Sequence, residues 1–235
     1  MSAPPARRLR STVRAMLPFP EPESWLDVGT GEAHLPDAAR EQFPYTSFDG
    51  LDATTKVEWA RGAERIEEAY VGRLTDPRIT GRLRARYDVV SMLHHLPHTR
   101  DPREELRAAV AVLRPGGHLL VEAPDPRSVF AVLLGRRWSP GARPGPLHLL
   151  SLDDLRTELE SLGCTIVKTD RRIAHIPHDL SASLSVVLPK SWVILPLLAA
   201  AKAIDLALAP LLSLTRFSNT YRLIARRGDP SEGPP

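Results

Sequence analysis

The stretch that decides the fold reads Trp25-Leu26-Asp27-Val28-Gly29-Thr30-Gly31. Its first four residues predict a buried strand, and the glycines that follow allow a sharp turn that a ligand can approach closely. A helix is expected from about Leu35, with Pro36 near its start, where a missing backbone N–H does no harm. The free N–H groups at the start of this helix predict a site for an anionic group.

Two carboxylates flank this glycine turn. Asp27 precedes it and is expected to orient the loop or to meet a cationic amine, while Asp52 ends a second strand expected over residues 46–51. A carboxylate at that second position accepts hydrogen bonds from both hydroxyls of a ribose. A dinucleotide-binding turn would carry a third glycine where His34 stands. Because the bulkier side chain obstructs pyrophosphate packing, NAD and FAD are disfavoured.

Further along the chain, apolar runs alternate with helical patterns, which is typical of a parallel sheet with crossover helices. Asp101 is a good cap for a helix that ends before Pro115, and Ser151 for a helix that Gly163 stops. The remaining strands are expected at residues 69–72, 87–92, 118–123, 165–167 and 221–225. The pattern predicts an α/β fold.

Length and composition suit one domain. The 235 residues divide into a basic, proline-rich lead-in over 1–23 with one short helix around Ser11–Leu17, a folded domain over 24–227, and a disordered tail over 228–235. A net charge of +3, with scattered arginines and few aromatics, gives no reason to expect a nucleic-acid partner. The single cysteine, Cys164, excludes an intramolecular disulfide, and a reducing cytoplasm fits best.

Four motifs, in this order and spacing, resemble those of class I S-adenosylmethionine-dependent methyltransferases. They are the opening stretch at 25–31, Gly50-Leu51-Asp52, the fourth-strand run Asp88–His98, and Leu113-Arg114-Pro115-Gly116-Gly117. The chain most resembles the branch that contains quinone-biosynthesis and small-molecule O-methyltransferases, which the segment Pro146–Ser151 also matches. One departure is that Leu96-Pro97-His98 stands where the family often has Leu-Glu-His, so any role of that glutamate is absent.

The resemblance implies a Rossmann-like class I methyltransferase fold. Its sheet would have seven mostly parallel strands with the last one antiparallel, helices on both faces, and an apolar helical insertion at about 176–217 before the last strand. The implied cofactor is S-adenosyl-L-methionine. By the same resemblance, the glycine turn would approach its methionine part, Asp52 its ribose, Asp76 its adenine, and Leu93 and His94 its sulfonium region. The implied cofactor-binding residues are Asp27, Gly29, Thr30, Gly31, Asp52, Asp76, Leu93 and His94.

Histidines are the candidate general bases, which methyl transfer needs only when the acceptor is protonated. His94, His95, His98 and His148 fall at or near the C-terminal ends of strands, where ligands bind in open α/β sheets. His148 and His94 are the first choices as catalytic residues, and the alternative is that His95 packs and His98 bonds a loop. Three histidines within five residues suit zinc, but the fourth-strand motif already explains them, so no metal site is expected.

Two acidic residues follow the fifth strand. Glu122 and Asp125 are expected within reach of an acceptor, and the alternative for Asp125 is a solvated loop carboxylate.

The segment Val193–Leu214 is strongly apolar and falls between the last two strands. We expect a helix that folds over the carboxyl edge of the sheet and walls the acceptor site. Its length reaches that of a membrane span, but Lys202 and Asp205 interrupt it and are expected to point outward or to pair with each other. An interfacial helix that touches lipid, or a homodimer surface, is the alternative, so a peripheral membrane contact of a cytoplasmic protein stays open.

These observations favour an enzyme that transfers a methyl group from S-adenosylmethionine to a small or lipophilic acceptor. Oxygen as the methylated atom rests on the resemblance alone. Two alternatives stay open. One is a methyltransferase-like protein that binds the cofactor without turnover, and the less favoured one is an NAD-dependent oxidoreductase.

Overall fold

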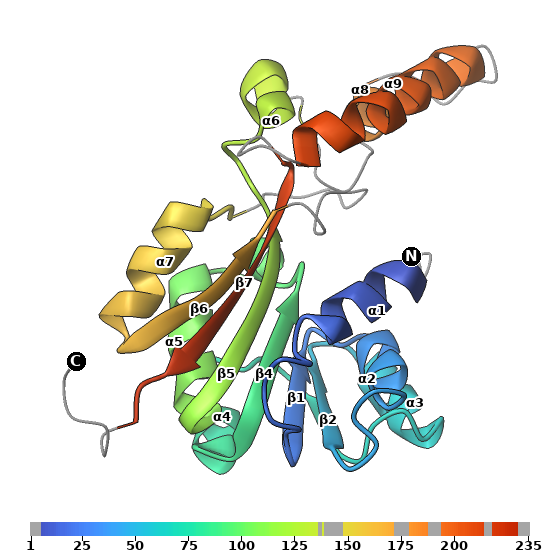
Figure 1. Cartoon of the computed structure of the whole chain (residues 1–235). Helices are drawn as coiled ribbons and strands as arrows, with labels where there is room; N and C mark the ends of the chain where they lie inside the picture. The colour runs from blue at the N-terminus through green and yellow to red at the C-terminus, as the bar shows by residue number, and fades with distance from the viewer. Residues whose placement is uncertain are drawn as a thin grey trace.

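The computed structural model describes residues 6–135, 138, 148–171, 179–187, 194–213 and 218–229. Its centre is one sheet of seven strands in the order β3-β2-β1-β4-β5-β7-β6 (Figure 1). The strands are β1 (Ser24–Val28), β2 (Ser47–Asp52), β3 (Ala69–Val71), β4 (Tyr87–Leu93), β5 (Leu113–Pro124), β6 (Cys164–Asp170) and β7 (Thr220–Arg227).

The pairing of the strands confirms the expected topology. β1 runs parallel to β2 and β4, β2 to β3, and β4 to β5, whereas β7 runs antiparallel to both β5 and β6. The apolar runs of β1 and β4 have few polar positions because both faces of a parallel sheet are covered. The expected Rossmann-like α/β architecture with an antiparallel last strand is confirmed.

Helices cover both faces of the sheet and bury two separate apolar clusters. One cluster lies under α1 (Ala6–Arg14), α2 (His34–Ala39) and α3 (Lys56–Gly62). The other lies under α4 (Pro77–Leu83), α5 (Pro102–Val112) and α7 (Leu152–Ser161). The remaining elements are the short 3-10 turn η1 (Leu96–His98) and the helices α6 (Val129–Leu134), α8 (Asp179–Val187) and α9 (Leu195–Ser213).

The caps that the sequence predicts are present. The Asp101 carboxylate accepts the N–H groups of Arg103 and Glu104 at the start of α5. Ser151 forms a reciprocal capping box with Asp154 at the start of α7, which satisfies two donors that a helix start leaves unpaired.

The N-terminal helix differs from the expectation in its bounds and in its packing. The sequence places a short helix around 11–17, whereas α1 spans residues 6–14 and residues beyond it form turns. Leu9 and Val13 are four residues apart, so they share one face, and both are buried in the cluster under α1. The described part of the lead-in therefore packs as part of the domain. Residues 1–5, and residues 230–235 of the expected tail, lie outside the described residues.

The apolar segment between β6 and β7 forms an arm of two helices, α8 and α9, beyond the carboxyl edge of the sheet (Figure 1). The expected helix is confirmed over 195–213, while residues 193 and 214 lie outside the described part. Lys202 is exposed as expected, but the outward orientation expected of Asp205 is wrong. Its buried carboxylate accepts the N–H groups of Leu180 and Ser181 at 2.9 and 3.0 Å and the Ser181 hydroxyl at 2.7 Å. Asp205 caps α8 from the neighbouring helix because the first N–H groups of a helix need acceptors.

We expect Asp205→Ala to loosen the arm, because the variant leaves buried N–H groups of α8 without an acceptor. The loss should be about 1–3 kcal/mol of local stability, measured by amide hydrogen exchange in α8 and α9. Lys202→Ala, three residues away on the exposed side, is the control and should change the same exchange rates little. Equal, small effects of the two variants would contradict the capping role.

Candidate functional site

The glycine turn lies at the edge of the sheet where the carboxyl ends of β1, β2 and β4 meet, which is where open α/β sheets bind ligands. The N–H of Gly29 donates to the Leu51 carbonyl of β2 at 2.8 Å, so the turn crosses the end of that strand. Gly29 and Gly31 have φ values of 74° and 54°, in the left-handed region that favours glycine. The N–H of Gly31 donates to Oδ2 of Asp52 at 2.9 Å, which joins the turn directly to the expected ribose acid.

The two glycines have different surroundings. A Cβ on Gly29 would lie 2.4 Å from Nδ1 of His95, whose Nε2 is 3.0 Å from a carboxylate oxygen of Glu105. His95 therefore packs on the turn, as the alternative for this residue predicted. A Cβ on Gly31 would meet no atom within 4 Å. The turn is thus closed at Gly29 and open at Gly31, which is the side that a ligand can reach.

Asp27 is held in place from below the turn. The Trp25 indole N–H donates to the Ser91 hydroxyl at 2.8 Å, and that hydroxyl donates to Oδ1 of Asp27 at 2.6 Å. Burial raises the pKa of Asp27 to about 6, although the hydrogen bond from Ser91 favours the ionised form. A buried carboxyl with a raised pKa at a strand end is typical of functional sites, because a cation that binds there supplies the missing counter-charge.

The two acids predicted to contact the ribose and the adenine, Asp52 and Asp76, lie in different surroundings. Asp52 also accepts from the backbone N–H and the hydroxyl of Thr54, at 2.8 and 2.6 Å, so its carboxylate is fixed at the mouth of the turn. Asp76 is exposed and caps α4 through the N–H of Arg78 at 2.9 Å. The role of Asp76 at an adenine ring stays a prediction.

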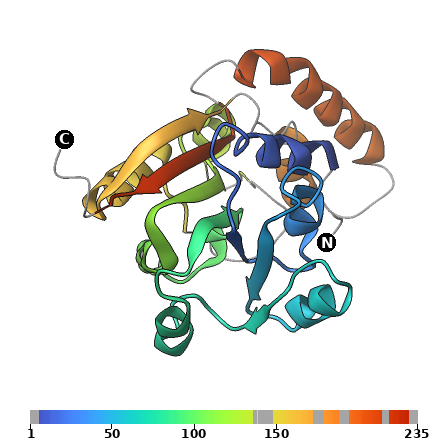
Figure 2. The ribbon, with the colours of Figure 1, turned by 60° about the horizontal axis from the view of Figure 1, so that its bottom comes forward.

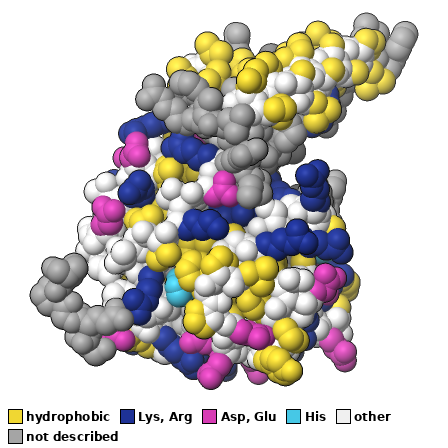
Figure 3. All heavy atoms as spheres, in the orientation of Figure 1, with side chains coloured by type: hydrophobic (Ala, Val, Ile, Leu, Met, Phe, Trp, Pro, Cys, Tyr) yellow, Lys and Arg dark blue, Asp and Glu magenta, His cyan; other side chains and the backbone are white. Residues whose placement is uncertain are grey.

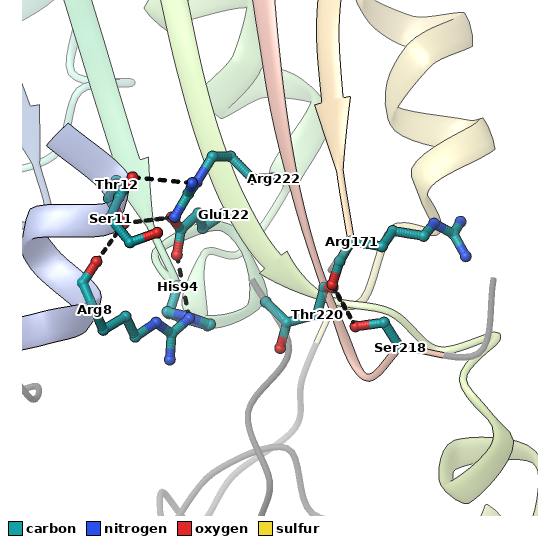
Figure 4. Close-up of polar contacts among 9 residues, drawn as sticks. All are labelled: Arg8, Ser11, Thr12, His94, Glu122, Arg171, Ser218, Thr220 and Arg222. Carbon is teal, nitrogen blue, oxygen red and sulfur yellow. Dashed lines mark hydrogen bonds and ion pairs between the residues drawn. The ribbon is translucent and has the colours of Figure 1, made fainter. Parts of the chain in front are cut away.

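β4 ends at Leu93, which packs against the cluster under α1, and His94 follows in a strained backbone conformation. The φ of His94 is 53°, which is rare for a residue with a side chain and persists only where its surroundings fix it. Here the His94 N–H donates to the Glu122 carbonyl at 2.7 Å, and its imidazole Nε2 contacts the Arg8 guanidinium from α1 (Figure 4). His94 thus connects β4 and β5 to the N-terminal helix.

A buried ionic cluster lies beside His94, and Figure 4 shows its side chains converging on Glu122. Glu122 and Arg222 are direct partners in the β5–β7 pairing, and Nε of Arg222 is 2.6 Å from a carboxylate oxygen of Glu122. The Thr12 hydroxyl donates to the same oxygen at 2.6 Å, and Arg8 donates to the other at 3.2 Å. Burial disfavours the ionised Glu122 carboxyl, but Arg222 and Arg8 outweigh it and hold its pKa below the usual value.

These contacts change the interpretation of the two acids that follow strand five. Glu122 is buried and paired with two arginines, so it stabilises the site instead of reaching for an acceptor. The solvated alternative for Asp125 is wrong, because this carboxylate is buried, lies 3.0 Å from the Arg171 guanidinium and accepts the Arg127 N–H. No local signal in the sequence points to Arg8 or Arg222 as partners of Glu122, because both are far from it along the chain.

His148 is exposed, and its backbone N–H donates to the Pro97 carbonyl at 3.0 Å, which ties the segment before α7 to the turn after β4. Both predicted catalytic histidines therefore border the carboxyl edge. In the part of the chain that the structure describes, no three His, Cys, Asp or Glu side chains gather in a way that would hold a metal ion.

Comparisons with known proteins agree with this architecture. A family model described as a methyltransferase domain matches residues 4–169. A ubiquinone biosynthesis O-methyltransferase of Marinobacter nauticus is 32% identical over 138 residues, which cover 52% of this chain and 54% of that protein. The chain spans about half the length of the curated relatives it matches.

Solved structures share the fold at low sequence identity. A chain from the complex between the Haloferax volcanii Trm112 methyltransferase activator and a methyltransferase has a TM-score of 0.66 and 17% identity, over 94% of this chain and 91% of that one. The magnesium protoporphyrin IX methyltransferase of Synechocystis PCC 6803, solved with bound S-adenosylhomocysteine, has a TM-score of 0.58 and 17% identity, over 95% and 83%.

Proposed function

Because this chain belongs to the methyltransferase domain family, we propose that it transfers a methyl group from S-adenosylmethionine to a small or lipophilic acceptor. The observation that carries the proposal is the hydrogen bond between the N–H of Gly31 and the carboxylate of Asp52. It places an open glycine turn and a ribose-type acid side by side at the carboxyl edge, where the fold binds ligands.

The groups at this edge fit such a cofactor. The open side of Gly31 admits a ligand, and Asp52 offers a fixed carboxylate to ribose hydroxyls. The Thr30 hydroxyl is buried beside Asp27 and, like that of Ser91, favours the ionised form of the carboxyl. Asp27 supplies a buried carboxyl below the turn for a cationic group. Leu93 and His94, at the end of β4, border the same edge.

The bound cofactor supplies the reactive methyl group, and this chain supplies position, water exclusion and proton handling. We propose methylation at oxygen, which the similarity to ubiquinone biosynthesis O-methyltransferases supports. His148 is the preferred general base because its side chain is exposed at the edge. His94 is the second choice, since its Nε2 contacts Arg8 and must leave that partner before it accepts a proton.

The proposal extends to partners and location. A cytoplasmic enzyme with a small-molecule acceptor is the simplest assignment, and α9 as a wall of the acceptor site stays a prediction. A peripheral membrane contact or a homodimer through the exposed side of α9 is the alternative use of that helix. A cofactor-binding protein without turnover is the second candidate function, favoured by Pro97 at the position where the family often has glutamate.

We expect Asp52→Ala to weaken binding of S-adenosylhomocysteine at least tenfold, because two charge-assisted hydrogen bonds to a ribose are lost. Asp49→Ala is the matched control on the same strand. Asp49 is buried and accepts from the Tyr87 hydroxyl at 2.7 Å, so its loss should lower the melting temperature more than the affinity. Calorimetric titration and thermal melts of both variants separate the effects, and the reverse ranking of affinities would show that the ribose acid is misassigned.

Turnover tests the proposed reaction. The full chain is incubated with methyl-labelled S-adenosylmethionine and a panel of phenols, catechols and amines of graded lipophilicity. Label transfer to a phenolic or catechol oxygen supports the proposal. Transfer to amines alone overturns the choice of oxygen, and binding without transfer to any acceptor favours the second candidate function.

A further inference from the structure

α9 turns an apolar face to solvent over residues 195–211, whose side chains the structure describes. At about 100° per residue, its exposed positions fall on one side of the helix, and Ala201, Asp205 and Leu208 lie on the other. Figure 3 shows hydrophobic side chains gathered over the arm, in contrast to the mixed surface of the body below. The large exposed side chains are Leu195, Leu197, Ile204, Leu206 and Leu211.

The charges of α9 are distributed unevenly around the helix. Its sequence contains two charged residues, Lys202 and Asp205. Lys202 is exposed, while Asp205 is turned inward and its carboxylate accepts hydrogen bonds from N–H groups of α8. The described side chains of α9 therefore offer solvent an apolar surface with a cation and no exposed carboxylate.

A second cationic element lies at the same edge of the sheet. α1 contains no acidic residue, and its Arg7, Arg10 and Arg14 are exposed. Figures 1 and 2 both place α1 beneath the arm, on the side toward which α9 extends. Arg10 has an exposed partner, Glu41, at 3.8 Å, an ion pair that water screens strongly.

We propose that the α8–α9 arm docks this protein on an anionic lipid surface. The apolar face of α9 would lie in the interfacial layer, with Lys202 and the arginines of α1 near the headgroups. Apolar residues on one side and basic residues beside them are typical of helices that lie in the membrane interface. No helix in the described part of the chain is long and apolar enough to cross a bilayer.

Charge favours lipid over a second copy of the chain as the occupant. Two arms packed face to face would bring α1 of each copy toward α1 of the other, with no acidic residue on that helix to balance its exposed arginines. An anionic headgroup layer supplies that balance. The inference goes beyond the proposed reaction, because docking needs neither the cofactor nor turnover.

Vesicle cosedimentation of the full chain tests the docking. Vesicles of phosphatidylcholine alone are compared with vesicles that contain one third phosphatidylglycerol, at low and physiological salt. We expect binding to the anionic vesicles, weakened by salt. The double variant Ile204→Asp/Leu206→Asp should reduce the affinity for anionic vesicles at least tenfold. The double variant Arg7→Gln/Arg14→Gln should reduce it about fivefold for each arginine that reaches the headgroups.

Tyr45→Asp is the control, because it adds a charge at an exposed aromatic residue before β2, at the opposite edge of the sheet. It should leave vesicle binding unchanged. Circular dichroism and the melting temperature show that every variant is folded. Because neither readout needs the cofactor, a failure of docking stays distinct from a failure of the proposed function. No binding to anionic vesicles, or a dimer that Ile204→Asp/Leu206→Asp dissociates while vesicles stay unbound, would overturn the proposal.

Discussion

Replacement of Gly29 by alanine is expected to destabilise the protein and to remove cofactor binding. The new Cβ would lie 2.4 Å from Nδ1 of His95, at a φ of 74°. Left-handed backbone costs about 1–2 kcal/mol in a residue with a side chain. Moving His95 away from the Glu105 carboxylate costs a further charge-assisted hydrogen bond of about 1.5–3 kcal/mol. Together these predict a loss of about 2.5–5 kcal/mol in the free energy of unfolding, measured by urea denaturation.

Gly31→Ala is the matched control two residues away. Its φ of 54° gives a similar backbone strain, but its Cβ would meet no protein atom within 4 Å. We therefore expect a loss of only about 1–2 kcal/mol from the backbone strain. The affinity for S-adenosylhomocysteine should fall clearly, because the new methyl group stands on the open side of the turn. Equal stabilities for the two variants would show that His95 does not hold the turn.

The second large effect is expected from Glu122→Ala, which leaves Arg222 buried without its counter-charge. Arg222 is 2% exposed, so water cannot replace the lost carboxylate. Removing one partner of a buried ion pair typically costs about 3–5 kcal/mol, and a fall of that size is expected in the free energy of unfolding at pH 7. Asp153→Ala, which breaks the exposed pair with Arg127, is the control and should change stability by less than about 1 kcal/mol.

The difference in unfolding free energy between wild type and Glu122→Ala depends on pH with a definite sign. The pKa of Glu122 is below its ordinary value of 4.5 in the folded protein, because the arginines favour the ionised form despite burial. Its contribution is therefore fully present above about pH 4.5 and is lost as the pH falls through the folded pKa. The unfolding free energies of wild type and Glu122→Ala should therefore converge in acid. A difference that stays constant well below pH 4.5 would contradict the ion pairs of Glu122 with Arg8 and Arg222.

Local signals were enough to predict the strands, the helix caps and the glycine turn. Apolar runs that end in glycine, and capping residues such as Asp101 and Ser151, act over a few residues, so periodicity and turn chemistry reveal them. The same holds for Asp52, whose position at a strand end places it at the turn without knowledge of distant contacts.

Contacts between distant segments could not be predicted. Glu122 meets Arg222 only because β5 and β7 pair antiparallel in one register, and it meets Arg8 only because α1 packs at the same edge. Asp205 has the sequence context of an exposed helix residue, yet it caps α8 because the two helices pack side by side. In each case the partner is set by tertiary packing, which a single sequence does not display.

Thermal melting of the full chain with S-adenosylhomocysteine and, separately, with NAD tests the cofactor assignment. A ligand that binds only the folded state at one hundred times its Kd adds about 2.7 kcal/mol of stability. For a chain of this size that predicts a rise in melting temperature on the order of 5–10 °C with S-adenosylhomocysteine, and none with NAD. A rise with NAD and no change with S-adenosylhomocysteine would contradict the assignment of this site to a methyltransferase.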